Sequence, residues 1–203
     1  MSVPDQEVHK MEALQAKVGL MPLPKPVILD LQQLREGIPG LTTALGDVHS
    51  ESAAVCLENQ GHSETVDLEV QNSDEQQYQL VRQPVTDTMR RAYFDLQRAT
   101  ELGACGVAIL LAREVTGLTA IQQSRKGGGF DYYLGPANQT EDTLPFQNSA
   151  RLEVSGILSG TDKQFGARVK LKLHQSQPSD DTGLPAIAVV VEFGRPQAQV
   201  AKR

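Results

Sequence analysis

The apolar positions of the first 85 residues predict one helix followed by one β-hairpin. Residues 41–60 carry apolar side chains at intervals of three and four, which is the spacing of an amphipathic helix. Gly61 follows at a position where helices commonly end. Residues 1–26 end in three prolines at alternate positions, which cannot continue a helix, so this segment is expected to form a flexible tail.

A strict alternation of apolar and acidic residues identifies the hairpin. Val66, Leu68 and Val70 alternate with acidic residues, which is typical of a strand with one buried face. A polar turn then leads to residues 78–81, the expected antiparallel partner. Residues 27–85 are therefore expected to form an N-terminal subdomain that consists of a helix and a hairpin with an acidic outer face.

The next segment predicts a buried helix and then a central strand. Thr86 or Asp87 can cap a helix in which apolar residues recur at helical spacing as far as Gly103. Residues 105–112 form a short, continuous apolar run that is rich in Val, Ile and Leu. Because this run is too short for another full helix, we expect a strand that is buried on both faces.

Further strands are expected at residues 118–124, 130–134, 150–157 and 185–193. The first would be the antiparallel return of the preceding strand, and the second is an extended aromatic segment that follows three glycines. The last is rich in β-branched residues, which suit a core strand.

Residues 162–175 fit two patterns. Thr161 and Gln164 have the spacing of a capping box, which predicts a helix. Residues 169–173 alternate strictly between apolar residues and lysine, which would also suit a strand. We favour the helix because of the cap and the length of the segment.

In order, the elements from Thr86 onward predict a helix, three core strands, a second helix and a last strand. We therefore expect an α/β (α+β) protein with a central mixed sheet and an αβββαβ core in residues 86–203. The N-terminal helix and hairpin are expected to pack with this core as one compact unit.

Composition narrows the class of protein. The chain has 203 residues, of which 39% are hydrophobic and 22% charged, the balance of an ordinary globular protein. Its apolar runs are far shorter than the ~20 residues that span a bilayer, and its N-terminus lacks a secretory signal pattern, so no membrane partner is expected. Two cysteines, Cys56 and Cys105, provide neither a disulfide framework nor a zinc motif, which favours a reducing, cytoplasmic location.

Charge is distributed unevenly along the chain. The net charge is −6, but residues 1–100 carry 8 Lys and Arg against 15 Asp and Glu, whereas residues 101–203 carry 11 against 10. The acidity belongs to the N-terminal half, where it would suit contact with a protein partner. A nucleic-acid partner stays open, because phosphate binding depends on a local basic surface rather than on the net charge.

Three acidic residues occupy particular places in the order of elements. Glu101 lies late in the first core helix, Asp131 opens a central strand, and Glu153 stands two residues before Ser155 on the next strand. With the order of elements over residues 86–193, this arrangement resembles the PD-(D/E)XK superfamily of nucleases, which has the restriction-endonuclease-like fold. The resemblance implies a Mg²⁺-dependent nuclease, or a diverged descendant of one, in which Asp131 and Glu153 hold the metal and Glu101 assists.

The implied chemistry needs a cation as well as carboxylates. Two carboxylates that project from neighbouring strands can bind Mg²⁺ through oxygen ligands and leave positions for water and a phosphate oxygen. The family usually places a lysine where this chain has Ser155, and some members relocate that lysine to a neighbouring element. Lys170 or Lys172 in the following helix, or Lys126 before the second motif, could supply the cation.

A glycine-rich stretch precedes Asp131. Consecutive glycines can present backbone N–H groups to an anion, so Arg125, Lys126 and Gly128 are candidates for binding the phosphate backbone of a substrate. The stretch lacks the ending of a P-loop, and a plain hairpin tip is the alternative interpretation.

Two functions follow from these observations. The first is a Mg²⁺-dependent nuclease, a phosphodiesterase that would act on nucleic acid with Asp131, Glu153, Glu101 and one of the two helical lysines. The second is a non-catalytic binding or assembly subunit of a multiprotein complex that retains the fold. The replacement of the motif lysine by Ser155 favours the second function, and the order of the carboxylates favours the first.

Overall fold

The computed structural model describes residues 25–71, 76–138, 149–175 and 183–202. The strands are β1 (Val27–Asp30), β2 (Thr65–Gln71), β3 (Tyr78–Val81), β4 (Thr119–Gln123), β5 (Tyr132–Gly135), β6 (Ala150–Ile157), β7 (Ala186–Glu192) and β8 (Gln197–Lys202). The helices are the 3-10 helix η1 (Leu31–Arg35) and the α-helices α2 (Thr43–Asn59), α3 (Asp87–Ala92), α4 (Leu96–Thr116) and α5 (Asp162–Gln175). The segment expected to form a tail, residues 1–26, falls outside the described residues except for its last two.

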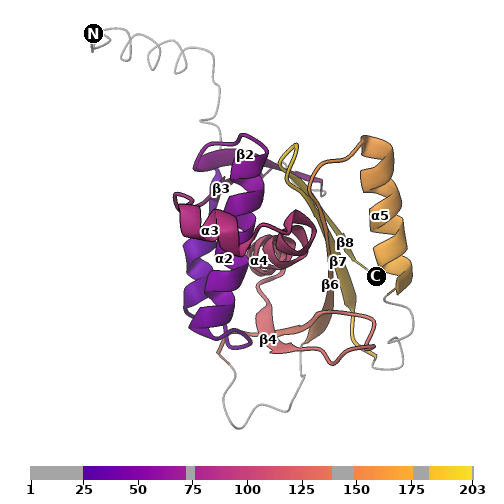
Figure 1. Ribbon diagram of the computed structural model, residues 1–203. Coiled ribbons are helices and arrows are strands. Elements are labelled where there is room, and N and C mark those ends of the chain that lie inside the picture. Colours follow the sequence, from indigo (N-terminus) through magenta and orange to yellow (C-terminus); the bar gives the residue numbers. More distant parts are fainter. Residues whose placement is uncertain (1–24, 72–75, 139–148, 176–182, 203) are drawn as a thin grey trace, which may run out of the picture.

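A mixed sheet of eight strands separates the helices into two layers. The strands lie in the order β1-β3-β2-β8-β7-β6-β5-β4. On one face α4 lies between α2 and the sheet, and on the other face α5 covers β6 and β7 (Figure 1). The predicted α/β class with a central mixed sheet is confirmed.

The C-terminal strand β8 connects the N-terminal hairpin to the rest of the sheet. It pairs antiparallel with β7 and parallel with β2, where Gln197 lies opposite Glu69. The hairpin of β2 and β3 is antiparallel, as the alternating pattern predicts. The polar segment after residue 193 is not among the strands that the sequence predicts. Burial of Ala198 against the main core explains why the segment pairs nevertheless.

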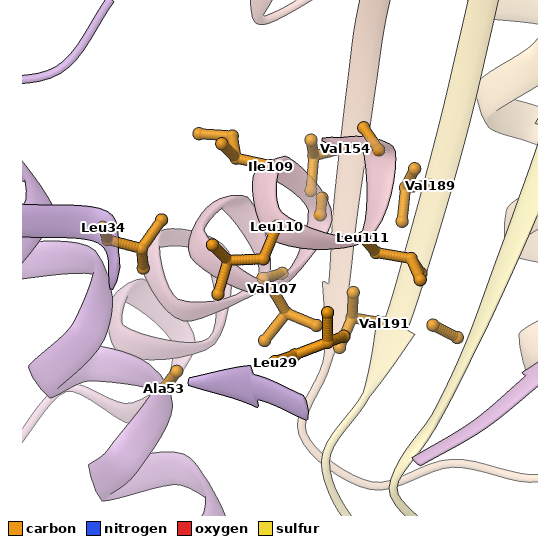
Figure 2. Close-up of a cluster of buried hydrophobic side chains, with 14 of the residues drawn as sticks. Leu29, Leu34, Ala53, Val107, Ile109, Leu110, Leu111, Val154, Val189 and Val191 are labelled. Atoms are coloured by element: carbon orange, nitrogen blue, oxygen red, sulfur yellow. The ribbon is translucent and has the colours of Figure 1, made fainter. Parts of the chain in front are cut away.

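The strand predicted at residues 105–112 is wrong, because these residues form the middle of α4. Figure 2 shows the reason: α4 has Leu34 and Ala53 on one side and the sheet residues Val154, Val189 and Val191 on the other. A helix that is covered on almost every side carries apolar residues at almost every position, so the helical period disappears from the sequence. With this correction, the three core strands between α4 and α5 are β4, β5 and β6.

The sequence predicts that the helix ends at Gly103, but the helix continues beyond it. Gly103 instead lets two helices approach each other. A Cβ atom at Gly103 would lie 2.7 Å from the backbone nitrogen of Ala53 in α2, closer than non-bonded atoms come. The helix continues to Thr116 and ends at Gly117, whose φ of 72° suits glycine. At its other end the predicted helix is divided into α3 and α4, which Thr86 and Asp95 cap separately.

The ambiguous segment 162–175 is a helix, as predicted, with the predicted bounds. The capping box is formed: Gln164 N donates to Thr161 Oγ1 over 3.3 Å, and Thr161 N donates to Gln164 Oε1 over 2.8 Å. Phe165 and Val169 are buried against Val190 of β7. Because α5 is fixed to the sheet by these side chains, the position of its other face relative to β6 is fixed as well.

A Gly103→Val substitution is expected to lower the free energy of unfolding by about 3 kcal/mol, because the added atoms would force α2 and α4 apart. Urea denaturation followed by circular dichroism measures this change. Gly166→Ala is the matched control: Gly166 also lies in a helix, but apart from its chain neighbours and the backbone of its own helix, a Cβ atom there would have no atom within 4 Å. This variant is therefore expected to be as stable as the wild type or about 0.5–1 kcal/mol more stable. Equal stability of Gly103→Val and the wild type would contradict this role for Gly103.

Candidate active site

The end of the pairing between β5 and β6 determines where the Asp131 side chain lies. The last paired residues are Tyr132 and Leu152, and Asp131 N donates to Leu152 O over 2.8 Å. The N–H group of Val154, two residues further along β6, donates to Asp131 Oδ2 over 2.7 Å. A carboxylate therefore takes the place of a backbone acceptor, which holds Asp131 beside the open edge of β6.

Glu153 of β6 contacts a lysine from the helix that covers this face. Lys172 Nζ donates to Glu153 Oε1 over 2.6 Å, and the two side chains are only 19% and 9% exposed. Lys172 is one of the three lysines that the sequence offered as a replacement for the motif lysine, together with Lys170 and Lys126. Lys170, the other candidate in α5, is exposed and does not line the cavity described below.

The carboxyl groups of Asp131 and Glu153 lie within hydrogen-bonding reach of each other. Burial raises the pKa of Asp131, although the Val154 N–H group and the Lys172 ammonium partly oppose that shift. Burial also raises the pKa of Glu153, and the negative charge of Asp131 adds to the effect, while Lys172 opposes it. Two buried carboxylates side by side are thus held in an environment that disfavours their joint ionisation and that a cation would relieve.

A cavity of about 250 Å³ lies beside these groups. Its lining residues come from α4, the start of β5, β6 and α5: Glu101, Cys105, Asp131, Val154, Ser155, Gly156, Arg168 and Lys172. Glu101 is an exposed residue of α4 on the wall opposite α5. The structure therefore brings together Glu101, Asp131 and Lys172 in one cavity, with Glu153 bound to Lys172 at its edge.

The glycine-rich stretch forms the tip of the connection between β4 and β5. At its base Ser124 N donates to Asp131 O over 2.7 Å, so the tip is joined to the segment that carries Asp131. Gly128 N donates to Arg125 O over 3.1 Å, which closes a turn and uses an amide that an anion would need. Arg125, Lys126 and Gly128 do not line the cavity. The geometry favours the hairpin-tip interpretation over a phosphate-binding loop.

Two residues of the cavity were missed as site residues in the sequence. Arg168 Nη1 donates to Ser155 Oγ over 2.9 Å, so an arginine contacts the residue that replaces the motif lysine. Arg168 stands four residues before Lys172, a spacing that places both on one helix face and could have indicated a shared role. Cys105 follows Glu101 by four residues in the same way, and burial raises the pKa of its thiol.

A buried histidine supports the strand that follows Asp131. His49 Nδ1 lies 2.8 Å from Leu102 O, and because a carbonyl only accepts, this nitrogen carries the proton. The Tyr132 hydroxyl then donates to His49 Nε2 over 3.0 Å. Burial lowers the pKa of His49, which keeps the ring neutral. These hydrogen bonds connect α2, α4 and β5 next to Asp131.

No protein-family model, curated protein or solved structure matches the chain. Within the described ranges, no helix is long and apolar enough to cross a membrane. The same residues contain no group of three or more His, Cys, Asp and Glu side chains arranged to hold a metal ion. Asp131 and Glu153 are the two carboxylates of this site that lie close enough to each other to hold one metal ion together.

Proposed function

We propose that the chain is a Mg²⁺-dependent phosphodiesterase that cleaves nucleic acid, built on a restriction-endonuclease-like core. The observation that carries the proposal is the arrangement of Asp131, Glu153 and Lys172. Asp131, just before β5, and Lys172 of α5 line one cavity, and Lys172 binds Glu153 of β6, whose carboxyl group lies beside that of Asp131. The order α4-β4-β5-β6-α5-β7 supports it, because it is the order of elements on which the sequence resemblance rests.

The donor atoms suit a hard divalent cation. Val154 N contacts Asp131 Oδ2 and Lys172 Nζ contacts Glu153 Oε1, and a cation would replace the contact between the two carboxyl groups. Mg²⁺ is bound by one or two carboxylates together with waters and phosphate oxygens, which matches a site with two carboxylates. When bound, the metal would supply a water of lowered pKa and stabilise charge on the phosphate.

The chain's own residues provide the remaining functions. Lys172 holds Glu153 in position and places a positive charge where the phosphate would gain negative charge during attack by water. Arg168 adds a second cation beside Ser155. Glu101, on the opposite wall, can accept a hydrogen bond from the attacking water. In the reaction water forms the new P–O bond, the bond to the leaving oxygen breaks, and that oxygen takes up a proton.

The alternative function is a non-catalytic binding or assembly subunit that retains the fold. One observation favours it: Lys172 and Arg168 already contact Glu153 and Ser155, so the site is partly neutralised by the chain itself. In that case the same ion pair would have a structural role only.

Cleavage assays distinguish these functions. Single-stranded and duplex DNA and RNA would be incubated with the purified full-length chain, with Mg²⁺ or with EDTA. We expect cleavage only with the metal, and a loss of about 1000-fold in Glu153→Gln, because metal catalysis contributes several kcal/mol to the rate. Lys170→Ala, an exposed residue two positions from Lys172, is the control and is expected to cleave at the wild-type rate. Absence of metal-dependent cleavage would support the non-catalytic function, whereas equal cleavage rates in Glu153→Gln and the wild type would contradict the assigned site.

A further inference from the structure

A second cavity extends the candidate active site along α4. Its volume is about 410 Å³, and it shares Glu101, Gly156 and Arg168 with the first cavity. From these shared residues it continues to the first turn of α4 and to the end of β6, where Leu96 and Leu158 line it. The two cavities therefore form one groove that leads from the carboxylates to the N-terminal end of α4.

An exposed aromatic side chain stands at this end of the groove. Phe94 lies in the bend between α3 and α4, two residues before Leu96, and 86% of its surface is exposed. Folding leaves this apolar side chain in water, which is less favourable than burial. A single exposed apolar residue is common on protein surfaces, so its meaning depends on its surroundings.

The bend that carries Phe94 is firmly attached to the rest of the protein. The preceding residue, Tyr93, donates its hydroxyl to Glu51 over 3.0 Å. In α3, Arg90 makes a two-point contact with Glu58 of α2, with both distances 2.8 Å, and Met89 is buried against α2. Phe94 is thus presented to solvent by an anchored corner, with its ring free to contact a ligand.

Arginine side chains lie along the groove between this corner and the candidate active site. Arg98, Glu101 and Cys105 recur on α4 at intervals of three and four, so Arg98 lies one turn before Glu101 on the face that lines the site. Arg91 lies three residues before Phe94. Neither Arg91 nor Arg98 forms an ion pair with any residue in the described part of the chain. Arg168 supplies a third guanidinium where the two cavities meet.

We propose that this groove binds a single nucleic-acid strand, with one unpaired base stacked on Phe94 and the adjoining phosphates beside Arg98 and Arg168. The inference rests on the proposed function and specifies its substrate as a strand with unpaired bases. An aromatic ring stacks on a base only if the face of that base is free, and in a duplex the neighbouring base pairs cover it. The guanidinium groups can pair with the phosphates of the strand, whereas an apolar peptide would leave these guanidinium groups unpaired.

Binding without cleavage tests this proposal separately from catalysis. The affinity of the full-length chain for a fluorescent single-stranded oligodeoxythymidylate would be measured in EDTA, where no metal-dependent cleavage occurs. Because stacking on an aromatic ring contributes ~1–3 kcal/mol per base, Phe94→Ala is expected to weaken binding by roughly 5- to 150-fold. Phe94→Trp is expected to bind at least as tightly as the wild type. Ile28→Ala, which removes another exposed apolar side chain at the sheet edge, is the matched control and should leave the affinity unchanged.

A strand of the same length without bases separates stacking from charge. Phe94→Ala and the wild type should bind this abasic strand equally, whereas Arg98→Ala should weaken binding to both strands. The proposal is overturned if the wild type does not bind the thymidylate strand, if Phe94→Ala binds it like the wild type, or if Phe94→Ala loses affinity for both strands alike. Cleavage together with any of these results would leave the phosphodiesterase function standing and remove only the role of Phe94.

Discussion

A Lys172→Met variant is expected to lose cleavage by about 100- to 1000-fold. The ammonium group of Lys172 is the cation closest to the paired carboxylates, at 2.6 Å from Glu153 Oε1, and methionine keeps most of its apolar stem without the charge. Removal of one preorganised group that stabilises developing charge typically costs this much in rate. Lys170→Met, on the same helix but exposed, should cleave like the wild type.

The same variant is expected to be less stable by about 3 kcal/mol at neutral pH. Loss of the lysine ammonium group leaves Glu153 buried beside Asp131 without a positive partner, and breaking a buried ion pair costs about 3–5 kcal/mol. The low end applies because the Lys172 side chain is 19% exposed. The double variant Lys172→Met with Glu153→Gln should recover part of this stability in urea denaturation, since the unpaired charge is then absent. Wild-type stability of Lys172→Met would show that the pair does not hold the site together.

Asp131→Asn is expected to have opposite effects on activity and stability. Cleavage should fall by about 1000-fold, because one of the two proposed metal ligands is replaced by a neutral amide. The amide oxygen can still accept from Val154 N, so the backbone geometry is retained. The metal-free variant should be more stable than the wild type at neutral pH, because it removes a carboxylate whose pKa burial raises next to Glu153.

The difference in stability should depend on pH in one direction. A carboxyl group whose pKa is raised by folding stabilises the folded state fully below its pKa in the unfolded chain, 3.8 for Asp131. This stabilisation is lost as the pH rises through the pKa of the folded state. The wild type should therefore lose stability relative to Asp131→Asn as the pH rises from about 4 towards 7. Urea denaturation of both proteins across this range, with EDTA present, measures the gap. A gap that stays constant or narrows would contradict the burial of an ionised Asp131.

The candidate site residues could be selected from the sequence more readily than some elements of the fold. Asp131, Glu153 and Glu101 could be selected as candidates because their positions relative to the strands and the helix resemble those of the nuclease superfamily. The lysine of residues 162–175 that would replace the motif lysine stayed open between Lys170 and Lys172, since the alternation of residues 169–173 gave no information on which lysine faces β6. In α5 the buried positions Phe165 and Val169 fix that choice in favour of Lys172.

The main error in the fold arose from burial. Residues 105–112 lie in a helix that both α2 and the sheet cover, so the apolar run carries no period that distinguishes a helix from a central strand. Strand β8 was missed for the opposite reason: its pairing with β2 and β7 depends on neighbours that are distant in sequence. The contact of Arg168 with Ser155 likewise depends on how α5 lies over β6.

The central claim is that Asp131 and Glu153 together hold a divalent cation. Crystals grown with Mn²⁺, which binds oxygen ligands as Mg²⁺ does and scatters anomalously, test this claim most directly. We predict one anomalous peak within ligand distance, about 2.2 Å, of a carboxylate oxygen of both Asp131 and Glu153 in the wild type, and its loss in Asp131→Asn. No peak at these residues in the wild type, or an equal peak in Asp131→Asn, would contradict the account.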